Sequence, residues 1–322
     1  MLRCLAILAT LCGGPLLADV NKEAITERRP PKQLSAFGFF ESLATMQPAK
    51  GVTPYEVTSP LFTDYADKSR YIYSPSPAAY QTEGVLEFPV GAALIKTFHY
   101  GANKVETRVL LHQEAGWKAW AYVWNEDGSD ATLKIAGANV LVQTEAHGEI
   151  DYRVPNANQC KACHIGTDGK LRPIGPKIRN LNMATQLSGL VAAGVLAEVG
   201  NTPPQTPDYR DTSLALEPRA RAYLDANCAH CHALGLPADT SGLYLNWEET
   251  RPIHLGVKKR PVAAGRGSGG LAFDIAPGAP ELSIILFRLK STDPGIMMPE
   301  IGRSTTHEEG VALIRAYIAS LK

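Results

Sequence analysis

The sequence lacks an excess of charge of either sign. Its 322 residues include 32 Lys and Arg against 32 Asp and Glu, so the formal net charge is zero. Proteins that bind nucleic acid generally present a basic face and a high isoelectric point. The balance therefore argues against a nucleic-acid partner. It leaves docking to a protein partner open, because a local patch of charge is enough for that purpose.

Long hydrophobic runs are also lacking, except for one at the N-terminus. "MLRCLAILATLCGGPLLADV" has a basic residue, then an apolar stretch, then small residues that end at Ala18. This order is typical of a secretory signal peptide cleaved after Ala18. The apolar stretch is too short to span a bilayer comfortably. We therefore expect residues 1–18 to be a signal peptide, the mature chain to be periplasmic, and no stable membrane span to remain after cleavage.

Cysteine is scarce and unevenly distributed. Two of the six cysteines, Cys4 and Cys12, fall in the expected signal peptide. The remaining four form two C-x-x-C-H motifs, at residues 160–164 and 228–232. No cysteine of the mature sequence is left over for a separate structural disulfide.

Each C-x-x-C-H motif supplies two thiols that can meet the two vinyl groups of a haem, and an imidazole directly after them that can reach the iron. The alternatives are a zinc site or a redox-active C-x-x-C pair. A histidine directly after both pairs has no role in a four-cysteine zinc site. The sequence therefore predicts two covalently bound haem c groups with histidine as the proximal iron ligand. The residues predicted to hold them are Cys160, Cys163, His164, Cys228, Cys231 and His232.

A sixth iron ligand is available downstream of the second motif. In "STDPGIMMPEIGRS", Met298 stands directly before Pro299 in a short loop that leads to the last helix. A thioether ligand raises the reduction potential, which suits electron transfer. We predict Met298 as this ligand and favour it over Met297, whose alternative role is in the hydrophobic core.

The sixth ligand of the first haem stays open at this point. Met183 is the methionine that follows the first motif within its segment, and we name it as the first candidate. His99, His112 and His147 of the preceding region are further candidates, although a single histidine in a strand is usually structural. An open, five-coordinate iron is the remaining alternative. His230, His254 and His307 are expected at the surface or at a helix cap.

The chain changes character near the first motif. Residues 53–152 form short runs of alternating β-favouring residues separated by turn sequences, after a short helix expected around residues 36–45. Residues 182–200 and 216–232 have helical patterns, and Asn182 and Gly200 are expected to start and stop the first of them. A Pro-rich link covers residues 201–209. Thr306 and Glu309 are placed as a capping box before the final helix.

These patterns predict an α+β protein. We expect a signal peptide (1–18), a β-rich, sandwich-like domain (19–152), a first haem segment (153–205) and a mainly helical second haem domain (206–322).

Parts of the sequence also resemble known cytochromes. "CAHCH", "PGAPELSIILFRLKSTDPGIMMPEIG" and the closing helix resemble a class I cytochrome c domain, over about residues 215–322.

More broadly, "FPVGAALIKTFHY", "VETRVLLH", "WAYVWNEDGSDA", "VPNANQCKACH" and "PIGPKIRNLN" resemble a little-characterised family of exported bacterial diheme c-type cytochromes. This resemblance spans most of the mature chain. It implies haem attachment at the four motif cysteines and axial ligation by His164 and His232, and it does not indicate a small-molecule substrate. The first motif departs from a standard cytochrome c because no helix is expected directly before it.

The favoured function is electron transfer between redox protein partners, so the chain is expected to be an electron carrier more than an enzyme. A haem oxidoreductase of peroxidase-like type is the alternative, in which the second haem feeds an open first haem. It would need a distal acid or base, for which His99, His112 and Glu106 are the available residue types. A third hypothesis is a binding or assembly factor whose β-rich domain recognises a partner.

Overall fold

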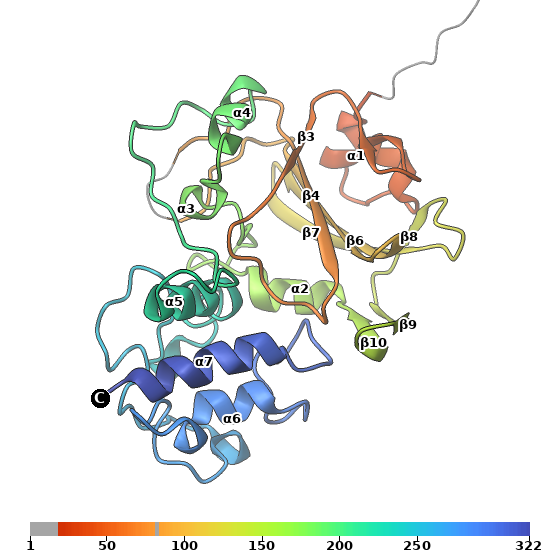
Figure 1. Cartoon of the computed structure of the whole chain (residues 1–322). Helices are drawn as coiled ribbons and strands as arrows, with labels where there is room; N and C mark the ends of the chain where they lie inside the picture. Colours follow the sequence, from red (N-terminus) through yellow and green to blue (C-terminus); the bar gives the residue numbers. More distant parts are fainter. Residues whose placement is uncertain (1–18, 81–83) are drawn as a thin grey trace, which may run out of the picture.

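The computed structural model describes residues 19–80 and 84–322, and the expected signal peptide lies outside the described residues. Antiparallel sheets and helices are both present, which confirms the α+β class (Figure 1). Among the described residues, no helix has the length and apolar character needed to cross a bilayer.

The largest unit is a six-stranded antiparallel sheet with the strand order β3-β4-β5-β6-β7-β8. Its strands follow one another along the chain. Two-residue turns at 101–102 and 114–115 join β5 to β6 and β6 to β7, as alternating sequence with intervening turn residues predicts, whereas longer segments join β3 to β4 and β4 to β5. Along β6, the side chains alternate between a buried face and a less buried one. The strands are β3 (Val52–Tyr55), β4 (Asp67–Tyr73), β5 (Ala93–Tyr100), β6 (Asn103–Gln113), β7 (Gly116–Trp124) and β8 (Ala131–Leu133).

One face of this sheet packs against the N-terminal segment. That segment contains α1 (Lys22–Thr26) and the short strands β1 (Phe40–Ser42) and β2 (Gln47–Pro48). Its side chains share a hydrophobic cluster with the sheet, in which Phe37 stacks on Phe39 at 4.9 Å between ring centroids. The first face is therefore closed by apolar packing.

The other face is covered at its two ends and left open in the middle. At one end, α3 (Ile178–Leu181) and α4 (Gln186–Ala192) pack on Ile72 and Leu94. At the other end, the hairpin of β9 (Ala138–Thr144) and β10 (Gly148–Val154) packs around Phe98. The middle of this face borders the cavity described below.

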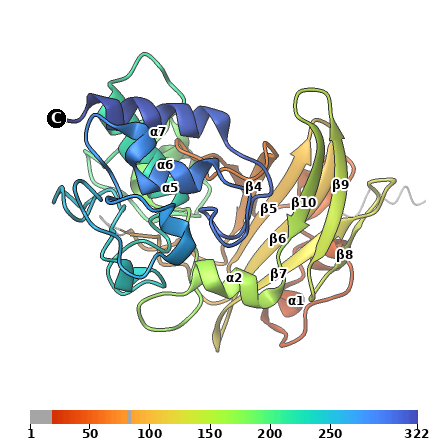
Figure 2. The same ribbon diagram turned by 90° about the horizontal axis from the view of Figure 1, so that it is seen from below.

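The second part of the chain is helical. Helices α5 (Leu216–Asn227), α6 (Ile284–Lys290) and α7 (Glu308–Ser320) share a hydrophobic core of their own. Figures 1 and 2 both place α2 (Ala157–His164) between these helices and the sheet. The first C-x-x-C-H motif thus lies where the two parts of the molecule meet.

Two helix predictions are wrong in their extent. The expected helix around residues 36–45 is a single 3₁₀ turn, residues 34–37, which ends at Gly38 with a φ of +64°. A Cβ atom on Gly38 would lie 2.5 Å from the carbonyl oxygen of Asp19, so the close approach of the chain requires glycine here. The helix expected over residues 182–200 is only α4, because Gly194 turns the backbone to a φ of +70° directly after it.

The expected helix caps also differ. Asn182 ends α3 and does not start α4. The predicted capping box at Thr306 and Glu309 is not formed, and His307 occupies the N-cap of α7 without a side-chain cap. Instead, the Asp64 carboxylate accepts hydrogen bonds from the backbone N–H groups of Ser304 and Thr305, at 2.7 and 2.8 Å. A loop of the β-rich part therefore holds the segment that leads into the last helix in place.

Candidate functional site

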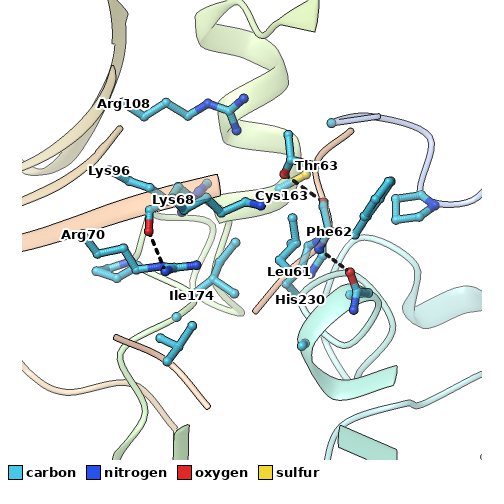
Figure 3. A pocket seen from close by; sticks show the side chains of 18 of the residues that line it. Leu61, Phe62, Thr63, Lys68, Arg70, Lys96, Arg108, Cys163, Ile174 and His230 are labelled. Atoms are coloured by element: carbon cyan, nitrogen blue, oxygen red, sulfur yellow. Dashed lines mark hydrogen bonds between the residues drawn. The ribbon is translucent and has the colours of Figure 1, made fainter. Parts of the chain in front are cut away.

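A cavity lies between the open part of the sheet, α2 and the helical part (Figure 3). The first motif lines it with Cys160, Cys163 and His164. Side chains of the helical part line its opposite side, among them Tyr223 and Arg303. The cavity thus joins the two regions that the sequence predicts as separate domains.

The first motif is itself helical. Strand β10 leads into it, and α2 begins at Ala157 with Asn156 and Gln159 forming a reciprocal capping box, each bond 2.9 Å long. Cys160 and His164 are four residues apart, so they lie on one face of the helix. The sequence prediction that no separate helix precedes this motif agrees with the structure, in which the motif's own helix presents the ligands.

His164 is oriented by its backbone partner. Its Nδ1 donates a hydrogen bond to the carbonyl oxygen of Arg172 at 2.8 Å, which leaves Nε2 as the nitrogen that can bind a metal. Burial lowers the pKa of His164 to about 3, although the hydrogen bond to Arg172 opposes this shift. The imidazole is therefore neutral at physiological pH, which is the form that ligates iron.

The second motif follows the end of α5, as expected. The N–H of His232 donates to the carbonyl of Cys228 at 2.9 Å, so the motif forms a helical turn. The Nδ1 atom of His232 lies 3.4 Å from the hydroxyl oxygen of Ser241. Burial lowers the pKa of His232 to about 4, so this imidazole is also neutral.

The two motifs meet in space. The Sγ atoms of Cys163 and Cys231 and a ring nitrogen of His230 all lie within 4.8 Å of one another. The hydrogen bond between the two thiols lowers the pKa of Cys163 to about 4 and raises that of Cys231. Cys160 and Cys228 do not belong to this cluster, so the four cysteines do not gather as a four-cysteine zinc site would require.

His230 corrects a sequence expectation. It was expected at the surface, but it lies between the two motifs, lines the cavity and has a buried Nδ1 without a hydrogen-bond partner among the described residues. The spacing of residues within its own motif does not predict this position, because Cys163, which lies close to His230, comes from the first motif.

The methionines near the second motif occupy different environments. Met297 is buried, with 2% of its surface exposed, whereas Met298 is partly buried. The carbonyl of Met298 accepts a hydrogen bond from Arg303 at 3.0 Å, and the following residues Pro299 and Ile301 line the cavity. The loop therefore stands at the cavity, and iron ligation by Met298 stays a prediction.

The candidates for the sixth ligand of the first haem lie elsewhere. Met183 lies between α3 and α4 and is not among the residues that line the cavity. His99, His112 and His147 do not line it either. His112 stacks on Trp117 at 4.5 Å between ring centroids, in the structural role that is usual for a single histidine in a strand.

Two kinds of cavity residue were missed by sequence reasoning. His307 was expected at the surface or at a cap, and it does occupy the N-cap of α7, but it also lines the cavity and stacks on Phe62 at 4.2 Å between ring centroids. The others are four cations on strands β4 to β6, shown in Figure 3: Lys68, Arg70, Lys96 and Arg108. The sequence feature that could have identified these cations is a charged residue within an apolar strand, as in "AALIKTFHY".

Neither a family model, nor a curated protein, nor a solved structure matches the chain.

Proposed function

We propose that this protein is an exported, periplasmic diheme c-type cytochrome that transfers electrons between redox protein partners. The observation that carries the proposal is the convergence of Cys163 and Cys231, one from each C-x-x-C-H motif, within 4.8 Å. Two attachment points side by side suit two redox groups that exchange electrons. Haem, when bound, supplies one-electron iron chemistry.

The residues present fit such a group. Cys160, Cys163 and His164 are presented together on the wall of a cavity, and both motif histidines are neutral imidazoles. The carbonyl of Arg172 holds the His164 ring with Nε2 free. The helical part, with the second motif, Met298 and the closing helix α7, supports the proposed resemblance to a class I cytochrome c domain.

The roles of the chain's own groups follow from these contacts. The thiols of each pair would form the covalent links, and His164 and His232 would be the axial ligands. Met298 would be the sixth ligand at the second site, and Met183 stays the named candidate at the first. Apolar residues such as Leu61 and Phe62 would exclude water from the cavity.

The test is expression with the export and haem-attachment machinery of a bacterial periplasm. Haem quantified by its pyridine haemochrome, together with intact mass, is expected to give two haems per chain. A double variant, Cys228→Ala with Cys231→Ala, is expected to keep one haem, and the matching Cys160→Ala with Cys163→Ala variant is expected to keep the other. A wild-type chain without covalent haem overturns the proposal.

A second candidate function has one observation in its favour. The residues that line the cavity beside His164 include no methionine. An open first haem would suit a haem oxidoreductase fed by the second. Electron paramagnetic resonance separates the two functions: two low-spin signals favour electron transfer, and a high-spin signal that responds to cyanide favours the oxidoreductase.

A further inference from the structure

A row of positive charge crosses the sheet where it faces the cavity. Arg70 on β4 is paired in register with Lys96 on β5, and Lys96 with Arg108 on β6. Residues directly opposite one another on neighbouring strands point to the same face. Three cations therefore stand side by side, and Lys68 joins them from two residues before Arg70. Figure 3 shows all four reaching from the sheet side of the cavity.

Such a row is unfavourable in itself. Like charges directly opposite each other in a sheet are destabilising, and burying a charge without a partner costs more. Burial and the charges of Arg108, Arg70 and Lys68 lower the pKa of Lys96 well below its usual value. A negative charge at this place would relieve the repulsion and favour the protonated form of Lys96.

The chain supplies only part of that charge. Glu106 is fully buried and pairs with Arg108 through two bonds of 2.7 and 2.8 Å. Arg70 reaches Glu56 at 3.2 Å, but 62% of the Glu56 side chain is exposed. Among the described residues, Lys68 and Lys96 form no ion pair, and Lys68 only donates to the carbonyl of Ala66 at 2.8 Å.

The position of the row indicates the kind of ligand. The cations line the same cavity as Cys160, Cys163 and His164, and this cavity also has an apolar side formed by residues such as Ile174. A group that fills it should combine an apolar body with acidic oxygens. Arg suits carboxylates because its guanidinium carries several N–H donors, and the bonds of Arg108 to Glu106 use its Nε and Nη2 atoms and not Nη1.

We propose that Arg70, Lys96 and Arg108, together with Lys68, form a carboxylate-binding site on the sheet side of this cavity. The carboxylates come either from the propionates of the first haem, in which case the inference rests on the proposed function, or from a free small organic acid. Both sources share the chemistry that this site recognises.

The test uses the haem-loaded protein in three forms. These are the wild type, Lys96→Met, and the control Lys118→Met, in which the replaced lysine is exposed on β7. Succinate is titrated by calorimetry, and the propionate bending band is followed by resonance Raman spectroscopy. A single cooperative thermal unfolding transition in each variant verifies that it is folded.

If a free acid is the ligand, succinate binds the loaded wild type, and Lys96→Met weakens binding about tenfold or more, since one charge-assisted hydrogen bond is lost. If the propionates fill the site, succinate does not bind, and Lys96→Met shifts the propionate band while Lys118→Met does not. No succinate binding and an unmoved band overturn the proposal. If the wild type carries no haem, the proposed function fails, and succinate titration of that protein still decides the carboxylate site: binding supports it, and no binding overturns it.

Discussion

The thiols of Cys163 and Cys231 lie within 4.8 Å of each other, although three whole helices of the chain, α3, α4 and α5, separate their motifs. A disulfide needs its two sulfur atoms at bonding distance, and this cluster brings one sulfur atom of each motif together. The relationship can therefore be tested without haem.

In protein expressed without haem attachment, mild oxidation should link Cys163 to Cys231, with the oxidant taking up the two electrons and the thiols losing two protons. The low pKa of Cys163, about 4, makes its thiolate available for this reaction at neutral pH. Peptide mapping by mass spectrometry under non-reducing conditions identifies the link, and Cys231→Ser removes it. A product linked mainly between Cys160 and Cys163 contradicts the observed proximity.

The adjacent methionines give a matched pair of variants. In haem-loaded protein, Met298→Leu should abolish the absorption band of a methionine–iron bond and lower the potential of the second haem, because a thioether ligand raises it. Met297→Leu should keep the band, since Met297 is a core residue and this swap conserves volume, at a cost below about 1.5 kcal/mol. Loss of the band in Met297→Leu alone would reverse the assignment.

The sequence predicts well what depends on local spacing. The two C-x-x-C-H motifs, the α+β class and the strands around β5 to β7 follow from patterns within a few residues. The ends of helices are harder to predict from the sequence. Asp64, which is far away in the chain, binds the loop before α7 in place of the expected capping box.

What the sequence could not predict depends on distant contacts. The position of His230 between the motifs results from the approach of the other motif, and the row of cations exists only because β4, β5 and β6 pair in one register. Alternation identifies a charged residue inside a strand. It does not identify which charge stands opposite it.

The buried ion pair of Glu106 and Arg108 is expected to stabilise the β-rich part strongly. Glu106→Gln should lower the free energy of unfolding by about 3–5 kcal/mol, because it leaves the Arg108 charge uncompensated and weakens the acceptor of the Tyr152 hydroxyl, which lies 2.7 Å away. Urea unfolding measures the change. Glu114→Gln, at an exposed turn, is the control and should change it by less than about 0.5 kcal/mol. Equal effects of the two variants would contradict the role of the pair.

The stability of the haem-free chain should also depend on pH through Lys68. Burial, followed by the charges of Arg70 and Arg108, lowers its pKa from 10.5 to about 7, while Asp67 and Asp64 act in the opposite direction. Between these two values the unfolded chain binds more protons at this position than the folded chain does. The free energy of unfolding should therefore rise with pH from about 7 towards 10.5, and below that window Lys68 should add nothing to the slope.

Urea unfolding at pH values below, within and above this window measures the slope. Lys68→Met should remove the part of it that Lys68 contributes, whereas Lys118→Met, which replaces an exposed lysine on β7, should leave it unchanged. Because a bound carboxylate favours the protonated lysine, succinate should flatten the slope if it occupies the cavity of the haem-free chain. An identical slope in the wild type and Lys68→Met would show that Lys68 keeps its ordinary pKa in the folded protein.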